Sequence, residues 1–202
     1  MTITWLGHSC FLIEQDGYRI ITDPYTNVAG YPPLRAEAHA VCCSHEHYDH
    51  NYREGVTLLP GRESPFTVGE IASFHDGEKG ALRGTNTIRT FTAGGYTVCH
   101  LGDLGHLLSE EQVGAIGKVD VLLIPVGGVY TIGPEEAKET ARRIGARCVV
   151  PMHYRHTPYG LPNVSGVERF LELFCSGDVE TLPGASFEVT DSLPAVLVPT
   201  YR

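Results

Sequence analysis

The stretch from Ser44 to His50, Ser-His-Glu-His-Tyr-Asp-His, constrains this chain more than any other. Side chains two apart in an extended segment point to the same side. His45 and His47 can therefore hold one cation together, while Asp49 and His50, after a change of direction, can reach a second. Imidazole and carboxylate are ligands that a divalent ion such as zinc prefers. The alternative is a histidine-rich surface loop, but this spacing arises by chance on the order of once in a thousand chains of this length, so we interpret it as a metal site.

Length and composition indicate one globular domain over residues 1–202. A chain of 202 residues can bury a sizeable core, and 42% of its residues are hydrophobic against 19% charged. No repeat, low-complexity tract or charge block divides it. The net charge of -9 and the lack of a Lys/Arg run make a nucleic-acid partner unfavourable, although two divalent ions would add positive charge at the site itself.

The cysteines and the hydropathy favour a cytoplasmic protein. The 6 cysteines form no CxxC pair and sit mostly in apolar runs, so we expect buried thiols in a reducing compartment. The first seven residues show neither a basic leader nor a long apolar run. No apolar stretch approaches the roughly 20 residues that cross a bilayer, so no membrane partner is expected.

The N-terminal third reads as short strands around a long loop. Residues 3–6, 11–14 and 18–22 are strand-like, with a turn at Asp16-Gly17. Residues 25–39 contain glycine and prolines without periodicity, which predicts an irregular loop that could line a pocket. Residues 40–43 are an apolar run typical of a buried strand, and they place the histidine stretch at a strand's carboxyl end, where open sheets bind ligands.

The remainder alternates strands with helices. Capping boxes at Ser109 and Ser165 predict helices to about Gly117 and through Phe174, and a third helix is expected over residues 135–144. The predicted strands cover residues 66–68, 71–74, 86–92, 96–101, 119–124 and 147–152, with further strand-like runs between 188 and 199.

Further candidate site residues stand just past predicted strands. His75 follows one strand and His153 another. Asp103 lies between Gly102 and Gly105, which we expect to let the backbone approach an ion closely. Asp23 either orients a ligand histidine or only terminates its strand. His8 is as compatible with a core or loop histidine as with a site residue.

These residues together resemble the metallo-β-lactamase superfamily. The resemblance rests on His-x-His-x-Asp-His at 45–50 with His75, Asp103 and His153, and it spans residues 3–156. Shorter pieces, at 5–9, 22–24, 125–131 and 151–154, look like small bacterial metal-dependent hydrolases related to ascorbate-6-phosphate lactonase. The resemblance implies a mixed α/β (α+β) fold, a four-layer αββα sandwich with two divalent ions at one edge of the paired sheets.

The resemblance also implies a set of ligands. The first ion would be held by His45, His47 and His75, the second by Asp49, His50 and His153, and Asp103 would bridge them, with Asp23 as a supporting partner. The flavodiiron branch of the superfamily usually has Glu in place of His47, so this histidine argues for hydrolysis over oxygen reduction. Leu104 departs from relatives that carry Thr there.

The chemistry expected of such a site is hydrolysis of an ester, lactone or phosphodiester in a small molecule. Two ions, zinc first with manganese or iron as alternatives, share one water and lower its pKa from 15.7 toward about 7, so that bridging hydroxide attacks a carbonyl or phosphoryl centre. Asp49 and Asp103 are the catalytic candidates. The unranked candidates for the leaving-group proton are Asp49, His106, Tyr154 and His156, and those for substrate contact are Tyr130, Thr131 and Tyr154.

Three rival interpretations stay open. A nuclease on this scaffold usually carries an extra clamping domain, for which 202 residues leave no space. A metal-binding or sensing protein would turn nothing over, but structural zinc sites are normally closed by four protein ligands, whereas seven ligands around two ions leave positions for water. An oxidoreductase would contain iron. A homo-oligomer is compatible with the sequence, which does not specify the substrate.

Overall fold

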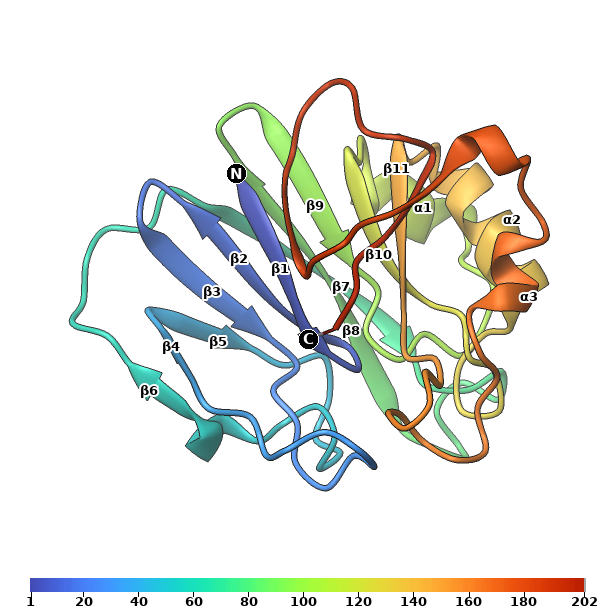
Figure 1. Ribbon diagram of the computed structural model, residues 1–202, viewed down its shortest axis with the longest axis horizontal. Helices are drawn as coiled ribbons and strands as arrows, with labels where there is room; N and C mark the ends of the chain where they lie inside the picture. Colours follow the sequence, from blue (N-terminus) through green and yellow to red (C-terminus); the bar gives the residue numbers. More distant parts are fainter. Residues whose placement is uncertain (202) are drawn as a thin grey trace.

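Two β-sheets pack face to face in the computed structural model, which describes residues 1–201 (Figure 1). The five-stranded sheet has the order β13-β1-β2-β3-β5, the seven-stranded sheet has the order β12-β14-β11-β10-β9-β8-β7, and β4 pairs with β6 separately. The strands are β1 Thr2–Gly7, β2 Cys10–Gln15, β3 Tyr18–Thr22, β4 Ala36–Ala38, β5 Ala40–Cys42, β6 Val56–Leu58, β7 Thr67–Phe74, β8 Thr85–Ala93, β9 Tyr96–His100, β10 Val121–Pro125, β11 Cys148–Met152, β12 Val179–Thr181, β13 Ser186–Glu188 and β14 Val196–Val198.

The α-helices belong to the seven-stranded sheet. Helix α1 (Glu110–Ile116) contacts β7, helix α2 (Pro134–Ile144) contacts β10, and the short helix α3 (Glu168–Leu171) packs on α2. The capping box that the sequence predicts at Ser109 is formed with Gln112. Two 3-10 turns complete the helical structure, η1 Arg53–Gly55 and η2 Ser176–Asp178.

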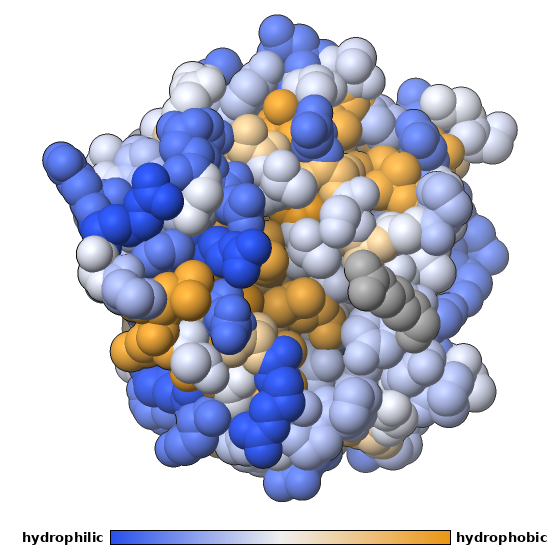
Figure 2. Space-filling model, turned by 60° about the vertical axis from the view of Figure 1, so that its left-hand side comes forward, coloured by the Kyte–Doolittle hydropathy of each residue, from blue (hydrophilic) through white to orange (hydrophobic). Residues whose placement is uncertain are grey.

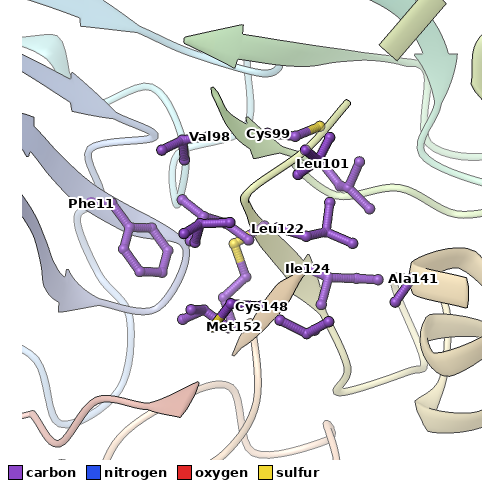
Figure 3. Close-up of a cluster of buried hydrophobic side chains, with 14 of the residues drawn as sticks. Phe11, Val98, Cys99, Leu101, Leu122, Ile124, Ala141, Cys148 and Met152 are labelled. Atoms are coloured by element: carbon purple, nitrogen blue, oxygen red, sulfur yellow. The ribbon is translucent and has the colours of Figure 1, made fainter. Parts of the chain in front are cut away.

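The main core lies between the two sheets and continues under the helices. Phe11 of β2 points toward β10 and β11, while Ala141 of α2 lies on the opposite side of these strands (Figure 3). Every residue of β10 and β11 is buried, as expected for parallel strands covered on both faces.

The outer face of the five-stranded sheet is covered differently from the four-layer expectation. Its side chains, among them Cys10 and Ile21, join a second apolar cluster with Tyr25, Tyr31 and Leu34. Within residues 1–201, the covering segment on this side contains β4, β6 and the turn η1 but no α-helix. Pro32 and Pro33 would break a helix that ran through residues 25–39. On this side of the molecule, hydrophobic residues remain visible in a hollow between hydrophilic ones (Figure 2). The sandwich of mixed α/β elements is confirmed, with its α-helical layer on one side.

Three predicted elements differ from the structure. The strand-like pieces at 66–68 and 71–74 are one strand, β7. The loop predicted over 25–39 contains β4, which pairs with β6 in parallel. The helix predicted after Ser165 is only α3, and its cap residue Val167 makes no side-chain cap bond. Ser165 is engaged elsewhere, because its amide donates to the Gly127 carbonyl and its own carbonyl accepts from Arg155.

The cysteines and the helices bear on the predicted environment of the protein. Cys175 is exposed, so the expectation of buried thiols is wrong for this residue. Among the described residues, no helix has the length and apolar character needed to cross a membrane.

Candidate metal centre

The predicted ligands come together because they follow strands that run in the same direction. His8 follows β1, Asp23 follows β3, and the 44–50 stretch follows β5; β3 pairs in parallel with β5, while β1 and β3 both run antiparallel to β2. In the other sheet, His75, Asp103 and His153 follow β7, β9 and β11, which share one direction. Carboxyl ends of such strands meet at one edge of a sheet. The two sheets therefore present imidazoles and carboxylates to each other at a common edge.

One group of nitrogen donors is formed by His45, His47 and His75. A ligand atom from each lies within 4.8 Å of the others. His45 Nε2 lies 3.0 Å from His47 Nδ1. His45 and His75 are buried and His47 is exposed, so this group faces the opening of the site.

The second group contains Asp49, His50 and His153, and also His8. Ligand atoms of all four lie within 4.8 Å of one another, and His8 Nε2 is 3.4 Å from Asp49 Oδ2. The rings of His8 and His153 have centroids 4.3 Å apart. The sequence left His8 undecided between core and site; the structure places it in this second group.

Asp103 stands between the groups. Its Oδ2 atom is 3.3 Å from His75 Nε2 of the first group. The same atom is 3.1 Å from His50 Nε2 and 3.3 Å from His153 Nε2 of the second group. One carboxylate oxygen thus faces three imidazoles drawn from both groups, which is the position that a bridging ligand requires.

The donors fit divalent cations. Zinc–nitrogen bonds of 2.0–2.1 Å at tetrahedral angles hold their donors about 3.4 Å apart, close to the separations just given. Within residues 1–201, buried polar atoms of this cluster lack a hydrogen-bond partner. Buried polar groups are normally satisfied, so such atoms point to an ion or other ligand. The atoms are both ring nitrogens of His8 and His153, Nε2 of His50, Nδ1 of His75 and Oδ1 of Asp103.

Asp23 and Ser44 orient two of the imidazoles. Asp23 Oδ2 accepts from His50 Nδ1 at 2.8 Å and from the Ser44 hydroxyl at 2.6 Å. Since that hydroxyl donates to Asp23, it accepts from His45 Nδ1, 2.9 Å away. Both rings are thereby held with Nε2 free to act as a ligand, the usual arrangement around metal-binding histidines. The contacts of Asp23 are those expected of a partner that orients a candidate ligand histidine, and Ser44, which carries no motif in the sequence, has a similar part.

Burial and neighbouring charges set the protonation of the cluster. Burial lowers the pKa of His45 to about 3, with the nearby His50 acting in the same direction. Burial, followed by His153, lowers the pKa of His8 to about 4. Burial also acts to lower the pKa of His50, but Asp103 and then Asp23 outweigh it and raise that pKa well above its ordinary value. His45 and His8 are therefore neutral at pH 7, as metal ligands must be.

Backbone strain is concentrated at the same place. His8, Asp23 and His153 have φ values of 52°, 41° and 53°, in the left-handed region that L residues rarely adopt. Each such conformation costs on the order of 1–3 kcal/mol and persists where the surrounding structure enforces it, often at functional sites. Here it turns each side chain from its strand end into the cluster.

Gly102 and Gly105 allow neighbouring chain segments to pack closely. From the sequence alone they are expected instead to let the backbone approach an ion. A side chain at Gly105 would overlap the backbone of His75 and Asp76, and one at Gly102 would overlap Asn86 and Ser44. The amide of Asp103 is fixed by the Asn86 side-chain oxygen at 2.9 Å.

The cluster opens into a pocket of about 500 Å³. Its walls include Tyr48, Tyr130, Leu161 and Arg83. Sequence reasoning does not identify Arg83, because a lone arginine in a Gly-rich loop belongs to no motif. The full lining is Glu46, His47, Tyr48, Asp49, His75, Arg83, Asp103, Tyr130, His153 and Leu161.

Four other candidates lie outside this pocket. The Thr131 hydroxyl donates to the Ile132 carbonyl. Tyr154 is buried against Trp5, with ring centroids 5.6 Å apart. His156 bridges to Tyr159, and both ring nitrogens of His106 contact backbone of Phe74 and Leu107. These contacts give the four residues structural partners, so Asp49 is the one proton-transfer candidate that the structure places at the pocket.

Comparisons with known proteins agree with this geometry. A sequence profile described as the Beta-lactamase superfamily domain matches residues 2–153. A protein from Methanoculleus marisnigri named metal-dependent hydrolase is 31% identical, with an alignment that covers 94% of this chain and 97% of that protein. A protein of the same name from Geobacillus thermodenitrificans is 29% identical, covering 94% and 100%.

A solved structure extends the likeness to the fold. The crystal structure of a candidate Zn-dependent hydrolase of the metallo-β-lactamase superfamily from Thermotoga maritima has a TM-score of 0.77 and 36% sequence identity, covering 98% of this chain and 97% of that one. The finer likeness to the ascorbate-6-phosphate lactonase group stays a prediction. The chain belongs to the metallo-β-lactamase superfamily.

Proposed function

We propose that this chain is a hydrolase that binds two divalent metal ions, with zinc as the preferred ion. The enzyme cleaves an ester, lactone or phosphodiester bond in a small molecule. The observation that carries the proposal is the Oδ2 atom of Asp103, which faces imidazoles of both donor groups at 3.1–3.3 Å. The names of the relatives, metal-dependent hydrolase and candidate Zn-dependent hydrolase, support the same class of reaction.

Some of these residues would bind the ions, and others would transfer protons. His45, His47 and His75 would hold one ion, Asp49, His50 and His153 the other, with Asp103 shared. Bound divalent ions lower the pKa of a water and stabilise negative charge that develops on substrate oxygen. The ions would do this at the floor of the pocket.

Asp49 is placed to take part in proton transfer, and it is present as the carboxylate. Burial acts to raise the pKa of its carboxyl, but the polar contact with His8 Nε2, 3.4 Å away, and the nearby His50 outweigh burial and lower that pKa below its ordinary value. The carboxylate is therefore ionised at pH 7 and lines the pocket. An oxygen of Asp49 can take a proton from the attacking water and return it to the leaving group.

Two rival functions are less well supported. A nuclease would bind a polyanion, which a net charge of -9 repels and for which a pocket of about 500 Å³ is small. Human tRNase Z shares the fold with this chain, but at 14% sequence identity this likeness says nothing about the substrate. A non-catalytic metal protein would have no need of a pocket in which the ligands His47, His75 and Asp103 are all reachable.

The test combines metal content with activity. Protein purified without chelator is expected to contain about two ions per chain by elemental analysis, and to hydrolyse members of a panel of lactones, 4-nitrophenyl esters and bis(4-nitrophenyl) phosphate in a chelator-sensitive way. Asp103→Asn should lose metal and at least 100-fold in kcat/KM, since it removes a ligand of both groups.

Asp120→Asn is the matched control, because Asp120 is also a buried aspartate but pairs with Lys118 and Arg147 away from the site. It should cost stability and leave metal content and activity in place. One ion per chain, or parental activity in Asp103→Asn, would refute the two-ion proposal. Hydrolysis confined to RNA would favour the nuclease.

A further inference from the structure

Arg83 is the cation of an otherwise acidic pocket. The residues that line the pocket within 1–201 include the carboxylates of Glu46, Asp49 and Asp103, but no other arginine and no lysine. A cation beside a metal-binding floor raises the local concentration of anions in a chain whose net charge of -9 would repel them.

The backbone around Arg83 is fixed relative to His75. Asp76, the next residue after that histidine, is buried and accepts four backbone N–H bonds from the loop that follows. The donors are the amides of Glu78, Gly80, Leu82 and Arg83, at 2.8, 2.9, 3.0 and 2.7 Å. Because Asp76 is bound to both ends of this loop, Arg83 keeps a constant position beside the His75 ligand.

The side chain of Arg83 is held by the opposite wall of the pocket. Its guanidinium lies over the Tyr130 ring, 5.8 Å from the centroid, and Nη2 donates to the Val129 carbonyl at 3.2 Å. Val129 has a φ of 63°, a conformation that is strained for a β-branched residue. The loop that carries Val129 and Tyr130 therefore presents a carbonyl and a ring face to the guanidinium.

Most of the hydrogen-bonding capacity of Arg83 remains available. A guanidinium has five N–H donors, and Val129 uses one of them. Other arginines, Arg89 and Arg143 among them, form ion pairs with glutamates, whereas in the described part of the chain Arg83 forms none. A half-buried guanidinium stacked on an aromatic ring, with free donors and no carboxylate partner, is suited to bind an oxyanion in bidentate fashion.

We propose that Arg83 is a specificity-determining residue, which binds a carboxylate or phosphate group that the substrate carries in addition to the bond that is cleaved. The inference rests on the proposed hydrolase function and narrows its substrate to anionic esters or lactones. The scissile group lies over Asp103 and the surrounding imidazoles, while the second, anionic group of the same molecule contacts Arg83 at the wall.

A different role for Arg83 would be to join the loops at Gly80 and Val129 without touching substrate. In that case substitution would lower stability and would slow all substrates alike. Comparing substrates that differ in one charge separates the two roles, because a loss that is confined to the anionic substrate cannot arise from a general loosening of the loops.

The experiment compares 4-nitrophenyl hemisuccinate with the neutral 4-nitrophenyl butyrate on the metal-loaded protein. The parent is expected to prefer the anionic ester by at least 10-fold in kcat/KM. Arg83→Gln should remove that preference while keeping the rate on the neutral ester, and Arg83→Lys should restore part of it. Arg35→Gln is the control, since Arg35 lies over Tyr52 at 6.0 Å outside this pocket and should leave the preference unchanged.

A binding measurement makes the two proposals separable. Calorimetric titration of the metal-loaded protein with phenylphosphonate and with glutarate should show binding that weakens at least 10-fold in Arg83→Gln, and the stronger of the two identifies phosphate or carboxylate as the preferred anion. If neither ester is hydrolysed but binding depends on Arg83, the hydrolase proposal fails and the anion site stands. If Arg83→Gln keeps the preference and the affinities, the anion site is refuted whatever the activity.

Discussion

At the scale of residues, the cluster brings together one imidazole with a lowered pKa, His45, and one with a raised pKa, His50, whose ring centroids are 4.4 Å apart. His45, with a pKa near 3, has the Ser44 hydroxyl and the His47 ring on its two nitrogens, and its nearest carboxylate contact, with Asp103, is 4.0 Å long. His50 has the carboxylates of Asp23 and Asp103 on its two nitrogens, at 2.8 and 3.1 Å. Without metal, His50 is therefore the imidazole that retains a proton at pH 7, and its ion pairs take over part of the role of the cation.

The protonation of His50 predicts that metal uptake releases a proton from it. His50 has a raised pKa in the metal-free protein, so its ion pairs contribute fully to stability below pH 6.5, and this contribution is lost as the pH rises through the raised value. Zinc requires the neutral ring. Titration with zinc in weak buffer at pH 7 should therefore release about one proton from His50, besides any proton lost by water.

Asp23→Asn isolates the contribution of His50. The substitution keeps a side chain able to contact His50 Nδ1 but removes the charge that raises its pKa. Proton release measured with an indicator dye should fall in this variant, whereas a proton from water would appear in both proteins. Equal release from parent and variant would contradict the assignment.

At the scale of elements, the edge of the sandwich depends on loops pressed against ligand backbones. Gly127 follows β10, its carbonyl accepts from Ser165, and a side chain there would overlap the carbonyl of His153. A glycine is needed at this position because of the close approach of the two segments, since its backbone is not in the left-handed region.

Gly127→Ala should therefore displace His153. We expect a loss of about 1–3 kcal/mol in the free energy of unfolding from overpacking, together with lower metal occupancy of the group that contains His153. Gly114→Ala is the control, because that glycine lies in α1 with no atom within 4 Å of an added side chain. It should stabilise the protein by about 0.5–1 kcal/mol. Urea unfolding and elemental analysis measure both effects, and full metal content in Gly127→Ala would refute the explanation.

The elements that could be predicted are those with a local signal. The buried runs of β10 and β11 and the Ser109 cap depend on hydrophobicity and on a side chain three residues away, so the sequence shows them. The pattern at Ser165 matches a cap equally well, but contacts with Gly127 and Arg155 outweigh it. Strand β4 could not be predicted, because its three residues are stabilised by pairing with β6.

At the scale of the whole molecule, the site joins the two sheets. The 44–50 stretch and His8 extend from the five-stranded sheet, whereas His75, Asp103 and His153 extend from the seven-stranded one. The spacing within 44–50 predicts a metal site by itself, whereas the assignment of His75, Asp103 and His153 as further ligands depends on the family resemblance. Arg83 required the structure, because its role depends on a loop fixed by Asp76 and on Tyr130 across the pocket.

Because the ligands come from both sheets, metal binding should stabilise the whole fold. Each ion at 100 times its dissociation constant contributes about 2.7 kcal/mol, equivalent to about 5–10 °C in Tm for a domain of this size. Dialysis against chelator should lower Tm by at least that amount, and excess zinc should restore it. Asp103→Asn, which lacks the shared ligand, should lose much less on chelation. An unchanged Tm after complete removal of metal would mean that the interface between the sheets holds without the ions and that their role is confined to the pocket.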